Sequence, residues 1–282
     1  MKMQKKSISL LDMVEEYAAS ETLNLPVFPK VAQELHEKMA DENSSINDIA
    51  AIIVKDQTLA GQMLKLANSA FFAGLNRVRT IRESIMRLGV NQVYNCLVAG
   101  SQKNYYLSHD PFIGRYLQVL WKHALATAKG SQWLLRKTGY PELADEGFLS
   151  GLFHDIGKLL LLRVIETIRA ENQDITISEH FVLEVLDSMH VEQGYTLMNE
   201  WSIPEVYCSV TKHHHDEELD SSDALLMVVR IVDQVCAKTG VSLKPDPELV
   251  TATLPEVHAM SIKEIVLAEL EVVIEDALEA EL

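Results

Sequence analysis

Apolar residues recur at three-to-four-residue spacing along almost the whole chain, which is the period of amphipathic helices. Ile49, Ile52 and Ile53 form one such set, and Leu59 and Met63 begin the next. Alternating β-branched stretches of the kind that form strands are few. The pattern therefore predicts an all-α protein of roughly a dozen helices, with no substantial sheet.

Proline and glycine residues interrupt this pattern at intervals typical of turns between helices. A longer interruption runs from Lys103 to Tyr116, where the peptide SHDPFIGR lacks the helical period. It is either a connection between two lobes or a loop within one body. We predict an N-terminal helical lobe over residues 1–110 and a second helical lobe over residues 111–282. The second lobe should end in an acidic amphipathic helix, Lys263 to Leu282, docked on the core rather than held by a partner.

The chain has 282 residues, enough to bury a sizeable core, and a formal net charge of −16. This charge argues against non-specific nucleic-acid binding, because a phosphate backbone requires a positive surface. It also disfavours adsorption to an anionic membrane surface. Cys96, Cys208 and Cys236 are widely spaced and form no CxxC pair, so we expect free thiols in a reducing compartment.

The first residues of the chain do not follow the pattern of a signal peptide. Asp12, Glu15 and Glu16 come before any long apolar run. No uninterrupted apolar stretch reaches the ~18 residues that a membrane-spanning helix needs. We therefore expect a soluble, cytoplasmic protein with neither a membrane nor nucleic acid among its partners.

The most informative peptide is GLFHDIGK, residues 151–158, in which His154 and Asp155 follow an apolar run. Burying such a pair is costly unless each side chain is hydrogen-bonded or ligates a metal. Imidazole nitrogen and carboxylate oxygen suit Fe, Mn, Zn, Ni or Co better than a metal that prefers sulfur. Adjacent helical residues point about 100° apart, so the pair can straddle one ion, or Asp155 can bridge two. A hydrogen-bonded core pair is the alternative.

Further residues of the same chemistry lie on both sides of this peptide. His123 begins an apolar run, and His190 and the sequence His213-His214-His215 follow downstream. Asp233 lies on an almost wholly apolar helix face, where an unpaired carboxylate would cost several kcal/mol. A cation or a strong hydrogen-bond donor is therefore expected beside it. The set as a whole indicates a metal centre; a buried polar network that holds the helices together is the alternative.

The order of these residues, a histidine, then His-Asp, then a distant aspartate, resembles the HD superfamily of metal-dependent phosphohydrolases. The resemblance implies an HD-type helical fold with metal ligands at His123, His154, Asp155 and Asp233. It also implies that Asp155 bridges metal ions and that Lys158 contacts phosphate or handles a proton. Asp155 and Lys158 are therefore the candidate catalytic residues.

The downstream histidines resemble the extended ligand set of the HD-GYP branch, which can hold two or more metals. The resemblance adds His190 and a histidine pair to the candidate ligands. Three consecutive histidines leave the register of that pair open, and counting from Pro204 favours His213 and His214. The chain then continues DEELDSSDALL with no Gly-Tyr-Pro, which argues against cyclic di-nucleotide hydrolysis.

Phrases in the N-terminal half are similar to the HDOD family, the HD-related output domain of bacterial signalling proteins. They are LPVFP at Leu25–Pro29, LKLANSA at Leu64–Ala70 and IRESIMRLG at Ile81–Gly89. The resemblance covers roughly residues 20 to 240. One departure is DQTL, since the family usually has a proline after Asp56. The resemblance implies a signalling protein as partner.

Two classes of function remain open. One is a metal-dependent phosphohydrolase that acts on a nucleotide or another phosphoester with one or two divalent ions, Fe, Mn, Zn or Ni. The other is a non-catalytic interaction or regulatory module whose metal site is structural or vestigial. A Gly-rich phosphate loop, a Ser-His-Asp arrangement and a dinucleotide fingerprint are absent from the sequence. The oligomeric state and the substrate are not determined by the sequence.

Overall fold

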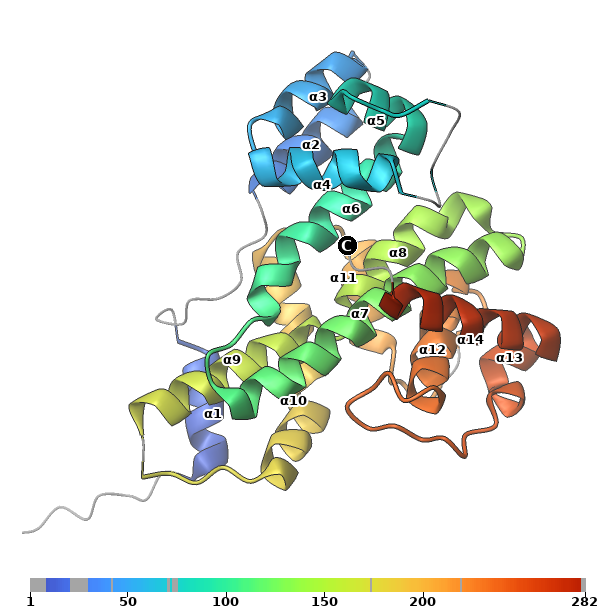
Figure 1. The fold of residues 1–282 in the computed structure, drawn as a ribbon. Coiled ribbons are helices and arrows are strands. Elements are labelled where there is room, and N and C mark those ends of the chain that lie inside the picture. Colours follow the sequence, from blue (N-terminus) through green and yellow to red (C-terminus); the bar gives the residue numbers. More distant parts are fainter. Residues whose placement is uncertain are drawn as a thin grey trace, which may run out of the picture.

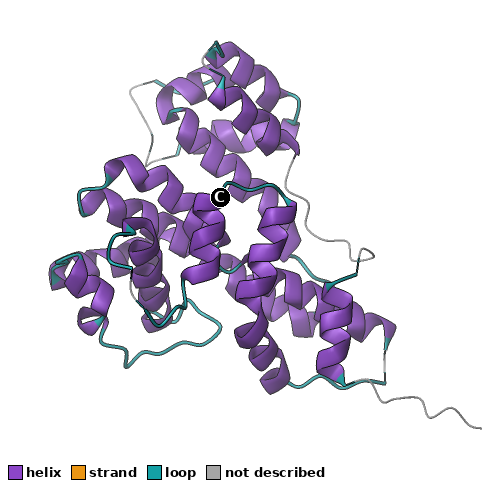
Figure 2. Cartoon of the chain, turned by 180° about the vertical axis from the view of Figure 1, so that it is seen from behind, coloured by secondary structure: helices purple, strands orange, loops and turns teal. Residues whose placement is uncertain are grey.

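The computed structural model describes residues 9–20, 30–41, 43–69, 72, 76–172, 174–218 and 220–279. Within these ranges every regular element is a helix and no strand is present, as Figure 2 shows. The predicted all-α fold is therefore confirmed. The phrase Leu25–Pro29, Ala70 and the last three residues of the predicted C-terminal helix lie outside the described residues.

The helices of the N-terminal half are, in chain order, α1 (Leu10–Ala18), α2 (Lys30–Ala40), α3 (Ile46–Val54), α4 (Gln57–Ala67), α5 (Ile81–Leu88) and α6 (Val90–Gln102). In Figure 1, α2 to α5 form the top of the molecule and α6 runs down from them toward the rest of the chain. By contrast, α1 packs against a helix of the second half, α9. The division of the chain at residue 110 stays a prediction.

The second half contains the short 3₁₀ helices η1 (Lys103–Tyr106), η2 (Pro141–Leu143) and η3 (Thr251–Thr253), together with α7 (Pro111–Lys137), α8 (Ala144–Phe153), α9 (Ile156–Glu171), α10 (Glu179–Glu200), α11 (Glu205–His213), α12 (Ala224–Lys238), α13 (Pro255–Ala259) and α14 (Glu264–Glu279). The long helix α7 packs against α8, α9, α12 and α14. It begins inside the predicted interruption, because Asp110 caps the amide of Phe112 at 2.8 Å and Pro111 occupies the first turn.

Local sequence signals explain the helix boundaries of the N-terminal half. Ser45 is the N-cap of α3 and exchanges hydrogen bonds with Asp48 in a capping box. Gly89, at the end of α5, has a φ of 83°, a conformation that glycine adopts without strain. The side chain of Asn68 donates to the carbonyl of Val78 at 2.9 Å and accepts from its amide at 2.8 Å. Asn68 therefore ties down the end of α4.

The C-terminal helix is docked on the core as the sequence predicts. Leu267, Leu270 and Ile274 of α14 are buried in an apolar cluster shared with α7 and α12. Ion pairs flank this face, with Lys137 and Glu269 2.8 Å apart and the Lys238 ammonium 2.6 Å from Glu271.

A glycine lets α8 approach α7 closely. A methyl group on Gly151 would lie only 2.6 Å from the carbonyl oxygen of Thr127 in α7. Because Gly151 precedes His154 by one helical turn, this close approach places the end of α8 beside the middle of α7, where His123 lies.

Cys96, Cys208 and Cys236 are free thiols, in agreement with the expectation from their spacing. Among the described helices, none combines the length and the apolar character needed to cross a bilayer.

Candidate metal centre

Seven side chains of the second half converge on one buried region. His123 lies in the middle of α7, and His190 and Asp233 lie on α10 and α12. His154 and Asp155 form the junction between α8 and α9, rather than lying within one helix. The remaining two, His214 and His215, directly follow α11.

The first cluster consists of His123, His154 and Asp233, each of which offers one ligand atom. The Nε2 atoms of His123 and His154 are 3.1 Å apart. Asp233 Oδ1 is 3.2 Å from the first and 3.9 Å from the second of these nitrogens. The three atoms are close enough together to bind a single metal ion.

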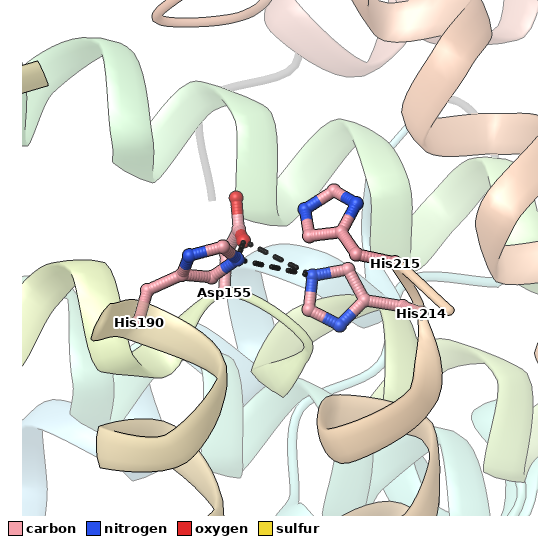
Figure 3. Close-up of side chains that lie close together, drawn as sticks. All are labelled: Asp155, His190, His214 and His215. Atoms are coloured by element: carbon pink, nitrogen blue, oxygen red, sulfur yellow. Dashed lines mark hydrogen bonds and ion pairs between the residues drawn. The ribbon is translucent and has the colours of Figure 1, made fainter. Parts of the chain in front are cut away.

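The second cluster consists of Asp155, His190, His214 and His215. The Nε2 atoms of His190 and His214 are 3.3 Å apart. In Figure 3 these two rings point toward each other and toward the Asp155 carboxylate, and His215 lies beside them. The ring centroids of His214 and His215 are 4.1 Å apart.

The carboxylate of Asp155 connects the two clusters through its two different oxygens. Oδ2 lies 3.4 Å from His123 Nε2 and 3.5 Å from His154 Nε2. Oδ1 lies 3.4 Å from His190 Nε2 and 3.5 Å from His214 Nε2. Asp155 therefore stands where a carboxylate bridging two metal ions would stand.

The backbone fixes the orientation of the buried rings. His123 Nδ1 is 2.8 Å from the carbonyl oxygen of Val241, and the Nδ1 atoms of His154, His190 and His214 are 2.7–2.8 Å from carbonyl oxygens of their own helices. A carbonyl oxygen only accepts, so each Nδ1 carries the donated proton. In the neutral ring Nε2 then presents its lone pair to the centre, the arrangement found in metal-ligating histidines.

One buried ligand atom lacks a partner that a metal ion would supply. Asp155 Oδ1 is buried and accepts no hydrogen bond within the described part of the chain. The close Nε2 pairs bring two lone pairs together, which is unfavourable unless a proton or a cation lies between them. The donor set of imidazole nitrogens and carboxylate oxygens suits Fe, Mn, Zn or Ni. The residues therefore fit a divalent metal centre.

The protonation states agree with this interpretation. Burial lowers the pKa of His154 and of His190 to about 3, and partial burial beside His214 lowers that of His215 to about 4, so these rings are neutral ligands at pH 7. Burial also acts to lower the pKa of His123, but hydrogen bonds with Asp155 and Asp233 outweigh it and raise this pKa well above 6.5. The raised pKa of His123 shows that the carboxylates of Asp155 and Asp233 stabilise a positive charge at this position.

Both aspartates remain charged in this buried environment. Burial acts to raise the pKa of Asp155, but the charge of Lys158 and the neighbouring histidines outweigh it and hold the pKa well below 3.8. Lys158 donates a 2.6 Å hydrogen bond to Asp155 Oδ2. The pKa of Asp233 is also lowered, because hydrogen bonding with His123 outweighs the effect of burial.

The structure brings together all but one of the sequence-predicted ligands. His123, His154, Asp155, His190, His214 and Asp233 all lie in the two clusters. His213 does not: its side chain is 42% exposed and its Nδ1 lies 2.7 Å from Asp216. His215 joins the second cluster instead, so the structure favours His214 and His215 over the expected pair. The sequence does carry a signal for this pair. Cys208 and Thr211 are buried on one face of α11, and His214 and His215 follow Thr211 by three and four residues, which places them on the same face.

A buried ion pair that the sequence did not reveal holds the turn after His215. Arg230 of α12 donates to Glu256 at 2.6 Å and to the carbonyl oxygen of Asp216 at 2.7 Å. Glu256 is nearly fully buried on α13. No residue motif signals this contact, because its three members are far apart in the sequence.

The HDOD domain family matches residues 25–217, more than half of the chain. The chain therefore belongs to the HDOD family. An uncharacterized protein of Treponema pallidum is 24% identical over 217 residues, which is 75% of this chain and 40% of that protein. The chain thus spans less than half the length of the curated relatives it matches.

Solved structures share the fold at low sequence identity. An HDOD domain protein of unknown function from Geobacter sulfurreducens superposes with a TM-score of 0.72 at 20% identity, covering 96% of both chains. A candidate metal-dependent phosphohydrolase of Shewanella amazonensis superposes with a TM-score of 0.70 at 17% identity, covering 95% of this chain and 96% of that one. At these identities the likeness establishes the fold alone.

Proposed function

We propose that this protein binds two divalent metal ions that share Asp155 and that it hydrolyses a phosphoester. The observation that carries the proposal is the position of the Asp155 carboxylate, with each oxygen 3.4–3.5 Å from a different pair of histidine Nε2 atoms. The name of the Shewanella structure agrees with this class of reaction.

The two clusters divide the ligands between two ions. His123, His154 and Asp233 would hold one ion together with Asp155 Oδ2, and His190, His214 and His215 would hold the other together with Asp155 Oδ1. When bound, such ions lower the pKa of a water molecule and neutralise phosphoryl oxygens.

The surrounding side chains indicate where a substrate would approach. His154, Asp155, His190 and His214 are almost fully buried. His215 is exposed, and the side chains of Lys158 and Asp233 are 16% and 15% exposed. A phosphoester would therefore approach over these three residues. Lys158 would contact a phosphoryl oxygen there, because its ammonium is held beside the bridging carboxylate.

The test is hydrolysis of bis(p-nitrophenyl) phosphate by the full chain reconstituted anaerobically with Mn(II) or Fe(II). We expect turnover that Lys158→Met reduces by about 100-fold without loss of bound metal, since an oriented cation of this kind stabilises the transition state. Lys263→Met removes an exposed lysine at the start of α14 and should leave turnover unchanged. Two bound ions with no turnover on any phosphoester probe would refute the catalytic part of the proposal.

A structural metal centre is the second candidate function, and the burial of the ligands favours it. His154 is fully buried, and the ligands come from the helices α7, α10 and α12 and from the turns that follow α8 and α11. Such a centre would hold these helices together without chemistry, as an interaction module requires. In that case chelation would unfold the protein and Lys158→Met would have no kinetic effect. The signalling protein partner that the resemblance implies stays a prediction.

A further inference from the structure

A second feature lies apart from the metal centre: a cavity of about 1090 Å³ between the two halves of the chain. Its walls come from α4 and α6 of the N-terminal half and from α7, α8 and α14 of the second half, helices that can be followed in Figure 1. None of the metal-centre residues lines it. The volume is that of a site for a small organic molecule.

Most of the cavity wall is apolar. Met63 and Leu97 contribute from the N-terminal half, and Trp133, Phe148 and Val273 contribute from the second half. Such a wall favours a ligand with an apolar body, because burial of that body removes apolar surface from water.

Among the charged side chains that line the cavity, Lys129 is the partly buried one without an ion pair in the described part of the chain, whereas Lys65 and Asp276 are exposed and Asp145 pairs with Arg136. Lys129 of α7 lines the cavity and is partly buried, and no carboxylate in the described part of the chain lies within ion-pair distance of it. Burial lowers its pKa. Its neighbour in the cavity, Arg136, differs in that it lies 3.8 Å from Asp145. A partly buried ammonium group with no partner attracts an anion.

We propose that this cavity binds a small organic anion with an apolar body, and that Lys129 pairs with its anionic group. The body would contact Trp133 and Phe148. The ligand would touch both halves of the chain at once. The proposal does not depend on metal binding or on hydrolysis.

The test compares two fluorescent probes with the same aromatic body, the anion 8-anilinonaphthalene-1-sulfonate and the neutral N-phenyl-1-naphthylamine, on the full chain. The anion should bind one site per chain. Lys129→Met should lower its affinity by about tenfold or more, because the variant loses a charge-assisted contact. The neutral probe should bind the variant and the wild type equally. Lys122→Met is the matched control on the exposed face of α7 and should change neither affinity.

Equal affinity of the anionic probe for wild type and Lys129→Met would overturn the proposal. Folding of the variant is checked by its melting temperature, which should equal or exceed that of the wild type because an unpaired, partly buried charge has been removed. A lower melting temperature would mean that Lys129 is paired within the protein and would also overturn the proposal.

Displacement of the anionic probe by octanoate, octyl phosphate and octanol identifies the anionic group. Either anion should displace the probe at a concentration about tenfold lower than octanol needs. The anion that acts at the lower concentration shows whether the ligand carries a carboxylate or a phosphate. Displacement by octanol at the same concentration as both anions would contradict a role for Lys129 and leave only an apolar cavity.

Discussion

Gly157 of α9 lies directly against the backbone of His190 on α10. A methyl group on Gly157 would overlap the carbonyl oxygen of His190 and lie 2.7 Å from the amide nitrogen of Gly194. The two helices can approach this closely only because neither residue 157 nor residue 194 has a side chain. Since Asp155 comes two residues before Gly157, this crossing sets the distance between the His190 ring and the Asp155 carboxylate.

The substitution Gly157→Ala should therefore separate α10 from Asp155. We expect a loss of about 1–3 kcal/mol in the free energy of unfolding, as in other overpacked sites, together with loss of metal from the second cluster. Urea denaturation and metal content measure the two effects. Gly61→Ala is the control, because nothing lies within 4 Å of the added methyl group. It should stabilise α4 by roughly 0.5–1 kcal/mol. A Gly157→Ala protein with full metal content would show that the second cluster binds metal without this close contact between α9 and α10.

The histidine register can be tested by single substitutions at adjacent positions. His214→Gln should remove one metal equivalent, because His214 Nε2 faces Asp155 Oδ1 at 3.5 Å. His213→Gln should retain the full complement, because that ring faces Asp216 at the surface. Elemental mass spectrometry of the two purified variants gives the answer. Loss of metal in His213→Gln as well as in His214→Gln would restore the pair His213 and His214 that is expected from Pro204.

The buried ion pair between Arg230 and Glu256 should stabilise the turn that carries His214 and His215. Glu256→Ala leaves the Arg230 guanidinium largely buried without its partner, which should cost about 3 kcal/mol in the free energy of unfolding. Glu34→Ala is the matched control, because Glu34 and Lys55 form an ion pair with side chains 38% and 67% exposed. Its cost should be below about 1 kcal/mol. Similar losses in both variants, measured by urea denaturation, would argue against a special role for the buried pair.

The buried neutral histidines predict the pH dependence of the metal-free protein. The pKa of His154 and of His190 is about 3 in the folded state, against 6.5 for an exposed ring, so below about pH 6.5 the unfolded chain binds more protons. Stability should therefore fall as the pH falls, by about 1.4 kcal/mol per pH unit for each ring. His123, whose pKa is raised, contributes stability that is lost only as the pH rises above about 6.5, so it does not oppose this fall.

The variant His190→Gln isolates one of these contributions. In the presence of chelator, its free energy of unfolding should depend less steeply on pH than that of the wild type between pH 6 and pH 4.5, by about 1.4 kcal/mol per pH unit. Identical slopes for the two proteins would mean that His190 is protonated in the folded state.

Much of this architecture could be predicted from the sequence, because it depends on local patterns. Apolar periodicity predicts the helices, and the HDIGK peptide and Asp233 stand out as polar residues in apolar surroundings. The structure places His123 Nε2 3.2 Å from Asp233, which meets the expectation of a strong donor or cation beside that carboxylate.

The remaining features depend on where separate segments meet. The inward face of α11 is set by the packing that buries Cys208 and Thr211, so counting from Pro204 alone could not decide which of three consecutive histidines are ligands. The contact of Arg230 with Asp216 and Glu256 and the cavity beside Lys129 are formed by helices distant in the sequence. The apolar periodicity of a single helix therefore cannot predict these contacts between helices.

The most direct test of the central claim is the metal content of the full chain and of Asp155→Ala, each reconstituted anaerobically with Fe(II) or Mn(II) and freed of excess ion. The shared carboxylate predicts about two equivalents in the wild type and near-complete loss in the variant, since both clusters use Asp155. A wild type that takes up at most one equivalent, or an Asp155→Ala protein that retains two, would contradict a dinuclear centre bridged by Asp155.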